Sequence, residues 1–309
     1  MKHVTSLESL HLNQSWVTIG SFDGVHRGHQ ALIGALVEQA HAQQQPAVVV
    51  TFFPHPVVVL KKITSPFYLT SAEERASLLG SLGVDIVVTL DFTRELAETP
   101  APVFMQQLAS HLGAFNLLVG SNFVLGRNRN GDIPALTRLG ASLGFKVTVV
   151  EPITQNEIIV SSSAVRQALQ DHDVALAAGL LGRPYSISGT VVEGDRRGRE
   201  LGFPTANLVT WEQHLLPSPG VYVTRAHLGS RVLPSVTNTG TRPTFSNASP
   251  APHAEVYILD FDEDLYGQTL QIDFLDFIRP EQHFSSRQDL IRRINLDVSR
   301  TREVFHHVS

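Results

Sequence analysis

The chain has 309 residues, a length that predicts two domains of roughly 150 residues each. Apolar residues make up 42% of the sequence, charged residues 17%, and the net charge is −5, so neither an intrinsically disordered chain nor a strongly basic nucleic-acid binder is expected. The sequence contains no cysteine, which excludes disulfide scaffolds, thiolate nucleophiles, zinc ribbons and Fe–S clusters. A bound metal would need oxygen or imidazole ligands.

The first half of the chain alternates short β-branched runs with amphipathic helical patterns. Apolar residues at helical spacing over 31–40 predict one helix, Ser71–Glu74 predicts a capping box, and Asp132 with Pro134 predicts another helix start. Near-continuous apolar strands between helices are typical of a parallel sheet covered on both faces. We therefore expect a doubly wound α/β domain, with strands at Trp16–Ile19, Val48–Phe52, Asp85–Leu90, Phe115–Val119 and Phe145–Val150.

The second half has a different pattern, beginning after Gly182. Short β-rich segments separated by Gly, Pro and Asp-rich turns predict a closed or nearly closed antiparallel barrel. One helical pattern, Ser285–Leu296, follows the strands. The expected domains are residues 1–182 and 183–309, and the expected barrel strands are Tyr185–Val192, Gly220–Leu228, Arg231–Asn238, Glu255–Phe261 and Leu270–Ile278.

No targeting or membrane-spanning segment is expected. Lys2 is not followed by an apolar run, and the most apolar stretch, Ala47–Leu60, is interrupted by two prolines and is shorter than a membrane span. These features predict a cytoplasmic protein that needs no membrane, nucleic acid or obligate protein partner.

The segment after the first strand has the layout of a phosphate site. The strand ends at Ile19, a glycine-containing loop follows over Gly20–Gly28, and a helix begins near Gln30. Backbone N–H groups and the helix dipole at such a junction bind anions, and His26 and His29 would direct donors to the same anion. Two alternatives remain open on these residues alone: plain helix-capping histidines, or a zinc site that adds His55.

Two common nucleotide-binding motifs are absent. The dipeptide Gly-Lys does not occur, so there is no Walker A loop, and Gly-x-Gly does not occur, so there is no dinucleotide fingerprint of the oxidoreductase type. A phosphate site in this chain must use another arrangement.

A second glycine-rich segment lies at the start of the second half. Gly189, Gly194 and Gly198 allow backbone N–H groups to surround an anion, and Thr205 and Asn207 lie two residues apart in an extended stretch. Their hydroxyl and amide oxygens are the kind of ligand that Mg²⁺ prefers. A barrel hairpin whose glycines serve only its turns is the alternative.

Both segments resemble a known family. Gly20–His29 (GSFDGVHRGH) and Gly198–Asn207 (GRELGFPTAN) are similar to the two signatures of the prokaryotic bifunctional riboflavin kinase/FMN adenylyltransferase (FAD synthetase) family. Further segments agree in the same order: Thr51–Pro56, Val119–Gly126, Arg129–Asp132, Ser161–Arg166, Pro219–Tyr222, Asn238–Phe245, Glu255–Phe261, Asp264–Gly267 and Ile278–Glu281. The resemblance implies a Rossmann-like nucleotidyltransferase domain followed by a six-stranded antiparallel β-barrel kinase domain with a C-terminal helix.

The resemblance also implies substrates and roles. The barrel would phosphorylate riboflavin to FMN with ATP, and the first domain would transfer AMP from a second ATP to FMN, giving FAD and pyrophosphate, with Mg²⁺ as cofactor. His26 and His29 would act on ATP phosphates, Glu255 would be the general base, and Thr205 and Asn207 would bind Mg²⁺. The implied nucleotide- and phosphate-binding residues are Gly20, Phe22, Asp23, Gly24, Gly28, Asn122, Ser162, Ser163, Arg166, Gly189, Gly194, Gly198 and Arg199.

Two other functions stay open. Val124 stands where the family often has arginine, so one alternative is a member that retains only the kinase activity. The other is a flavin-binding regulator without chemistry, against which the presence of Glu255 and both histidines argues, since a binder needs no general base.

Overall fold

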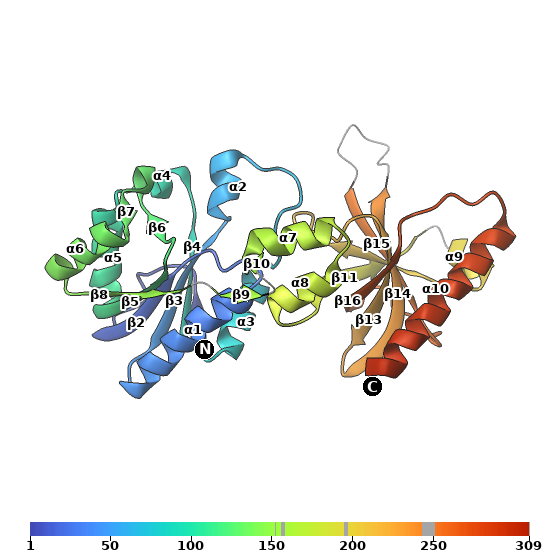
Figure 1. Ribbon diagram of the computed structural model, residues 1–309, viewed down its shortest axis with the longest axis horizontal. Coiled ribbons are helices and arrows are strands. Elements are labelled where there is room, and N and C mark those ends of the chain that lie inside the picture. Colours follow the sequence, from blue (N-terminus) through green and yellow to red (C-terminus); the bar gives the residue numbers. More distant parts are fainter. Residues whose placement is uncertain (152, 156–157, 195–196, 243–250, 309) are drawn as a thin grey trace. The chain divides into compact units, whose positions relative to one another are not determined.

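The computed structural model describes residues 1–309 except 152, 156–157, 195–196, 243–250 and 309. The chain forms two compact units, Met1–Ser162 and Ser163–Ser309, which we describe separately as the first and second unit (Figure 1). The boundary that the sequence suggests at residue 182 lies 20 residues further along and remains a prediction.

The first unit is built on one parallel sheet. Its strand order is β1-β4-β3-β2-β5-β8, and every pair is parallel. All five predicted strands are present, whereas β1 was not predicted because it has only three residues at the sheet edge. The strands are β1 (Lys2–Val4), β2 (Gln14–Ile19), β3 (Ala47–Phe53), β4 (Ile86–Asp91), β5 (Ala114–Gly120) and β8 (Lys146–Val150).

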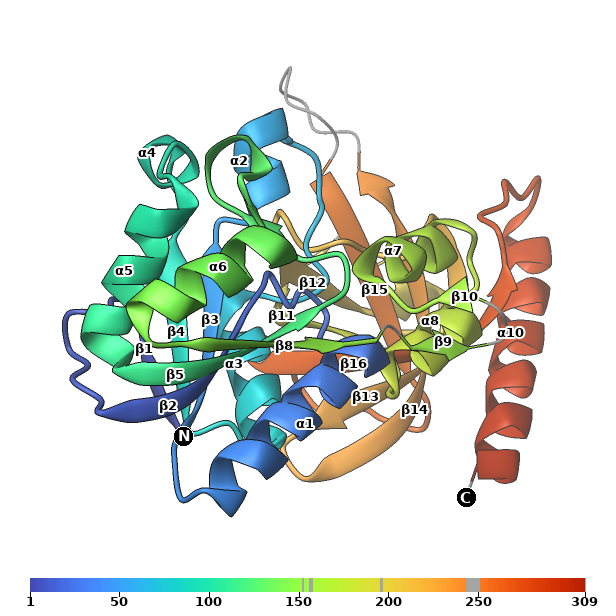
Figure 2. The same ribbon diagram turned by 60° about the vertical axis from the view of Figure 1, so that its left-hand side comes forward.

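Helices cover both faces of this sheet, as the apolar strands predict (Figure 2). On one face α1 (Arg27–Ala42) and α3 (Ala72–Ser81) pack against Val49 and Val87. On the other, α5 (Ala101–Leu112) and α6 (Ile133–Leu143) pack against Val48 and Val50. Successive strand residues therefore serve opposite cores.

The expected helix starts are confirmed. Ser71 and Glu74 form the reciprocal capping box of α3, and Asp132 accepts from the Ala135 N–H at the start of α6. Shorter elements complete the unit: α2 (Pro56–Lys61), α4 (Arg94–Ala97), a 3₁₀ turn at Arg127–Arg129, and the hairpins β6 (Val124–Leu125) with β7 (Gly131–Asp132) and β9 (Thr154–Gln155) with β10 (Ile158–Ile159).

The sheet order locates the natural binding edge. From the central strand β2 the chain continues to β3 on one side, while β5 pairs with β2 on the other side. Ligands of doubly wound sheets bind beyond the carboxyl ends of the strands at such a switch point. The β2–α1 loop begins there and leads to His26 at the N-cap of α1 and His29 in its first turn.

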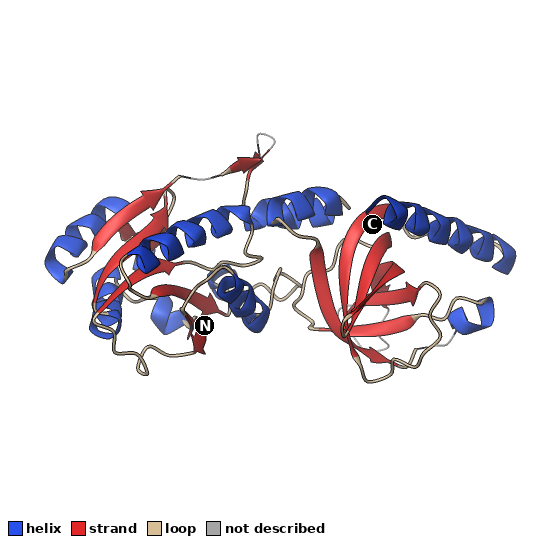
Figure 3. Cartoon of the chain, turned by 90° about the horizontal axis from the view of Figure 1, so that it is seen from below, coloured by secondary structure: helices blue, strands red, loops and turns tan. Residues whose placement is uncertain are grey.

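The second unit is a closed antiparallel barrel with the strand order β11-β12-β15-β14-β13-β16 (Figure 3). The six strands are β11 (Tyr185–Val192), β12 (Ala206–Thr210), β13 (Gly220–Leu228), β14 (Arg231–Arg242), β15 (Ala251–Ile258) and β16 (Thr269–Arg279). Alternate residues such as Ile187, Val256 and Ile272 fill the interior and are almost fully buried. The helices α7 (Ser162–Gln170) and α8 (Val174–Leu181) precede the barrel, and α9 (Arg197–Leu201) follows β11.

Three features of this unit differ from the expectation based on sequence patterning. The strand expected over Glu255–Phe261 is β15, Ala251–Ile258, which begins and ends earlier in the chain. β12 was not identified as a strand, although the family resemblance required a sixth. The final helix, predicted over Ser285–Leu296, is α10 (Arg287–Val308), which extends 12 residues beyond the predicted end and lies alongside the barrel (Figure 3). Asp297 on α10 accepts hydrogen bonds from Arg279 of β16, both side chains being buried, and this ion pair anchors the extended helix. No helix in the described part of the chain is long and apolar enough to cross a membrane.

Candidate active sites

The β2–α1 loop makes a tight turn held from within by an aromatic ring. Phe22 and Val25 both have positive φ angles (47° and 41°), as does Gly24. The buried Phe22 ring lies under Gly20, where a Cβ would come within 3.0 Å of it, and meets the His29 ring edge-on with centroids 5.0 Å apart. Gly20 and Phe22 therefore shape the loop, and their contact with nucleotide stays a prediction.

Asp23 anchors this loop to the segment before α3. Its carboxylate is completely buried and accepts hydrogen bonds from the N–H groups of Leu69 and Thr70 and from the Thr70 hydroxyl, at 3.1–3.2 Å. The Gly24 N–H donates to the same hydroxyl. These bonds give the Asp23 side chain an internal role, and its contact with nucleotide stays a prediction.

His26 and His29 lie together at the first turn of α1. Their rings stack with centroids 3.5 Å apart, and the His29 N–H donates to His26 Nδ1, so His26 caps the helix. Gly28 makes room for this ring, because a Cβ there would lie 3.1 Å from it. Burial, then the neighbouring charges of His26 and Arg75, lower the pKa of His29 well below its ordinary value, so this imidazole is neutral at pH 7.

The zinc alternative finds no support among the described residues, since no group of three or more His, Asp or Glu side chains is arranged to hold a metal ion. His55 instead caps α2, where its Nδ1 accepts from the Val57 N–H.

The remaining predicted residues of this half lie on two segments. The Ser162 hydroxyl donates to the Asp23 carbonyl at 2.8 Å, which ties the start of α7 to the β2–α1 loop. Ser163 and Arg166 follow on α7. Asn122 is exposed in the turn after β5, and Val124 begins β6.

In the second unit, three polar side chains form a row across the barrel wall. Glu255 on β15 pairs directly with Asn207 on β12 and with Asn238 on β14. Residues directly opposite in antiparallel strands project from the same face, with Cβ atoms about 5 Å apart. We call Asn207, Glu255 and Asn238 the polar row. It brings together the predicted base and one predicted Mg²⁺ ligand.

Glu255 has a further partner that sequence reasoning missed. His253 Nε2 lies 2.8 Å from Glu255 Oε1, and the histidine side chain is largely buried. Their i, i+2 spacing on one strand places both on the same face, which is the signal that could have identified the pair.

The glycines of this region lie against the polar side chains. A Cβ on Gly194 would lie 2.1 Å from the Asn207 amide nitrogen, and one on Gly198 would lie 3.3 Å from the Thr205 hydroxyl. Gly189 is inside β11 rather than in a loop, where a Cβ would lie 2.7 Å from the Val209 carbonyl oxygen.

A cavity of about 600 Å³ lies near Thr205, and its lining includes the inward-facing Val256 rather than the neighbouring Glu255. Gly198, Thr205 and Glu193 line it, together with the 261–266 turn. Three parts of the predicted site fall outside the described parts of the chain: the Arg199 side chain, Asp195–Arg196 and Pro243–Phe245.

Comparison with known proteins matches both halves of the chain. The sequence profile of the FAD synthetase family matches residues 8–164, and that of the riboflavin kinase family matches residues 181–305. A bifunctional riboflavin kinase/FMN adenylyltransferase of Escherichia coli (strain K12) is 41% identical over 94% of this chain and 92% of its own length. The chain belongs to this family.

Other members are similarly close. The bifunctional riboflavin kinase/FMN adenylyltransferases of Pseudomonas fluorescens and Bacillus subtilis (strain 168) are 40% and 35% identical, each over 92% of this chain, covering 91% and 90% of their own lengths. A solved structure titled macrolide-efflux protein, from Streptococcus pneumoniae, superposes with a TM-score of 0.87 at 29% identity, covering 97% of this chain and 98% of its own. The chain thus combines the parallel-sheet and closed-barrel folds that its sequence indicated.

Arg75 is a residue of the adenylyltransferase half that sequence reasoning missed. It lies on the buried face of α3 with Ala76 and Leu79, and its side chain is fully buried. A cation at an apolar-face position was the available signal.

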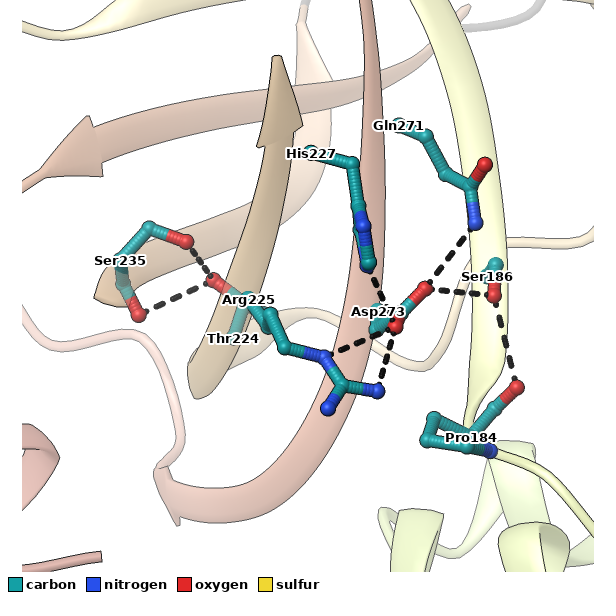
Figure 4. Close-up of polar contacts among 8 residues, drawn as sticks. All are labelled: Pro184, Ser186, Thr224, Arg225, His227, Ser235, Gln271 and Asp273. Carbon is teal, nitrogen blue, oxygen red and sulfur yellow. Dashed lines mark hydrogen bonds and ion pairs between the residues drawn. The ribbon is translucent and has the colours of Figure 1, made fainter. Parts of the chain in front are cut away.

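The kinase barrel also carries a polar cluster outside the predicted site (Figure 4). Asp273 on β16 accepts hydrogen bonds from Arg225, His227, Ser186 and Gln271 and is 4% exposed. Burial alone would raise the pKa of Asp273, but these hydrogen bonds outweigh burial and lower it. The cluster joins β11, β13 and β16 where the barrel closes.

Proposed function

We propose that the outer wall of the barrel carries riboflavin phosphorylation and that Glu255 is its general base. Glu255 takes the proton from the terminal ribityl hydroxyl as that oxygen attacks the γ-phosphate of ATP and ADP leaves. Positioning and charge neutralisation dominate phosphoryl transfer, so a carboxylate held beside the binding groups suits this step. The observation that carries the proposal is the direct pairing of Glu255 with Asn207 across β12 and β15.

Thr205 and Asn207 fit a Mg²⁺ ion. Both supply hard oxygen donors, and Gly194 and Gly198 pack so closely against the Asn207 and Thr205 side chains that a Cβ at either glycine would crowd them. When bound, the ion would neutralise charge on the ATP phosphates. The adjacent cavity, bordered by Thr205 and Gly198, offers space for the nucleotide.

The β2–α1 loop is the proposed site of adenylyl transfer. An oxygen of the FMN phosphate attacks the α-phosphate of ATP, the bond to the β-phosphate breaks, and pyrophosphate leaves. His26, a neutral His29 and the N–H groups at the start of α1 would donate to the phosphate oxygens. Ser162, Ser163 and Arg166 on α7, with Asn122, are proposed to hold further phosphate oxygens, where arginine offers a planar fork.

The direct test is product analysis. Purified protein is incubated with riboflavin, ATP and Mg²⁺, and products are separated by chromatography. FMN together with FAD supports both proposals. Formation of FMN alone contradicts the adenylyltransferase assignment and favours the kinase-only alternative suggested by Val124. Formation of neither product contradicts both enzymatic assignments and favours the flavin-binding regulator. We further propose that the substrates are riboflavin, FMN and ATP in the cytoplasm, with no obligate protein, membrane or nucleic-acid partner.

A further inference from the structure

Arg75 is a buried cation with incomplete hydrogen bonding. Its side chain has no exposed surface, and within the described residues its Nε and one terminal nitrogen have no partner. Burial lowers the pKa of Arg75, an effect that the nearby Asp23 carboxylate opposes. A buried charge with unpaired donors destabilises a fold, so its presence beneath a binding loop calls for a functional explanation.

The bonded nitrogen of Arg75 joins the anion loop to the neighbouring strand. NH1 donates to the carbonyl of Ser21, to the Phe52 carbonyl at 3.2 Å and to the Thr51 hydroxyl at 3.3 Å. Ser21 lies in the β2–α1 loop, and the other two residues lie near the carboxyl end of β3. One guanidinium thus fixes the loop against the binding edge of the sheet.

Arg75 is the source of fixed positive charge beneath the β2–α1 loop. His29 is neutral at pH 7, partly because Arg75 is close enough to disfavour a second positive charge. Asp23 lies beneath the same loop, where its carboxylate accepts from the N–H groups of Leu69 and Thr70 and stabilises the charged guanidinium of Arg75. The fixed positive charge of this region therefore comes from the guanidinium rather than from the imidazole.

We propose that Arg75 is a positioning residue of the adenylyltransferase site, which holds the β2–α1 loop in place and supplies a fixed positive charge beneath the triphosphate of ATP. The inference rests on the proposed function of the first unit and adds the source of its selectivity for a highly charged nucleotide. A unit charge acting over about 10 Å at an effective dielectric near 20 changes an affinity by about tenfold.

The test compares Arg75→Met, Arg75→Lys and the control Arg138→Met, which removes an exposed arginine of α6. FAD formation from supplied FMN is measured with two competitive inhibitors, α,β-methylene-ATP and adenosine. Arg75→Met should raise the inhibition constant of the triphosphate analogue about tenfold and leave that of adenosine within about twofold, whereas Arg75→Lys should retain most of the analogue affinity. Equal weakening toward both inhibitors, or equal effects of Met and Lys, would overturn the proposal.

Two further readouts separate charge from folding. Riboflavin phosphorylation by the second unit reports on the active protein in every preparation and should not change. In Arg75→Met, NMR titration of labelled histidine should show the pKa of His29 rising toward its ordinary value, and an unchanged titration contradicts the proposed charge. Wild-type protein that forms no FAD would instead disprove the function assigned to the first unit.

Discussion

Replacing Gly194 by alanine tests the metal-binding side of the kinase site. A Cβ at this position would lie 2.1 Å from the Asn207 amide nitrogen and 2.9 Å from its oxygen, where ordinary contacts begin at 3.4 Å. The amide must therefore retreat by about 1 Å, and a misplacement of that size costs about 100-fold in a positioned reaction. We expect Gly194→Ala to lower kcat/KM for riboflavin phosphorylation by about 100-fold.

The assay follows FMN formation from riboflavin and, separately, FAD formation from supplied FMN. The second rate should be unchanged in Gly194→Ala, because the other reaction is assigned to the other unit. Val209→Ala is the matched control, since Val209 is the next outward position of β12 after Asn207 and is 58% exposed. Normal FMN formation by Gly194→Ala would refute the role of Asn207, and equal loss in the control would show that β12 merely unfolds.

Three other changes test the remaining assignments. His29→Ala should reduce FAD formation by about 10²- to 10³-fold without affecting FMN formation, because it removes one preorganised phosphate contact; parallel loss of both products would contradict the separation of the sites. Glu255→Gln should lower FMN formation by at least about 100-fold while FAD is still made from FMN, and an unchanged kinase rate would show that Glu255 is only a strand residue. Asp273→Asn should destabilise the barrel by about 2 kcal/mol at pH 7 in thermal or urea unfolding. Because the folded pKa of Asp273 is lowered, its stabilisation is complete above the unfolded value of about 3.9 and is lost as the pH falls through the folded pKa. The difference between wild type and variant should therefore begin to shrink below about pH 4 and vanish only below the folded pKa. A difference that persists in acid would mean that the carboxylate charge is not the cause.

Local sequence patterns were sufficient to predict most strands and helix starts of the first unit. β-branched runs such as Val48–Phe52 have no polar face, so they can only be central strands covered on both sides. The capping residues Ser71 and Asp132 mark helix starts because their side chains satisfy backbone N–H groups within the same turn. His26 and His29 could be placed for the same reason, since a strand followed by a glycine loop and a helix fixes their location through short-range geometry.

Local sequence patterns do not predict the contacts of residues whose partners are distant in the chain. The bonds from the N–H groups of residues 69 and 70 to the Asp23 carboxylate are one example. In the sequence Arg75 is an ordinary charged residue of a helix, and only the tertiary structure shows its hydrogen bonds to Ser21 and Phe52. Such contacts join segments more than 20 residues apart, and no local pattern encodes them.

In the barrel, local sequence predicted most strands, but only the tertiary structure determined which side chains lie together. Its alternating segments predicted strands, but β12 is only five residues long and follows a Gly-Phe-Pro turn, so its pattern was too weak to identify. Sequence resemblance identified Glu255 and Asn207 separately. Only the pairing register of β12, β15 and β14 sets them side by side with Asn238, because a shift of one residue would turn every one of these side chains to the opposite face of the barrel wall.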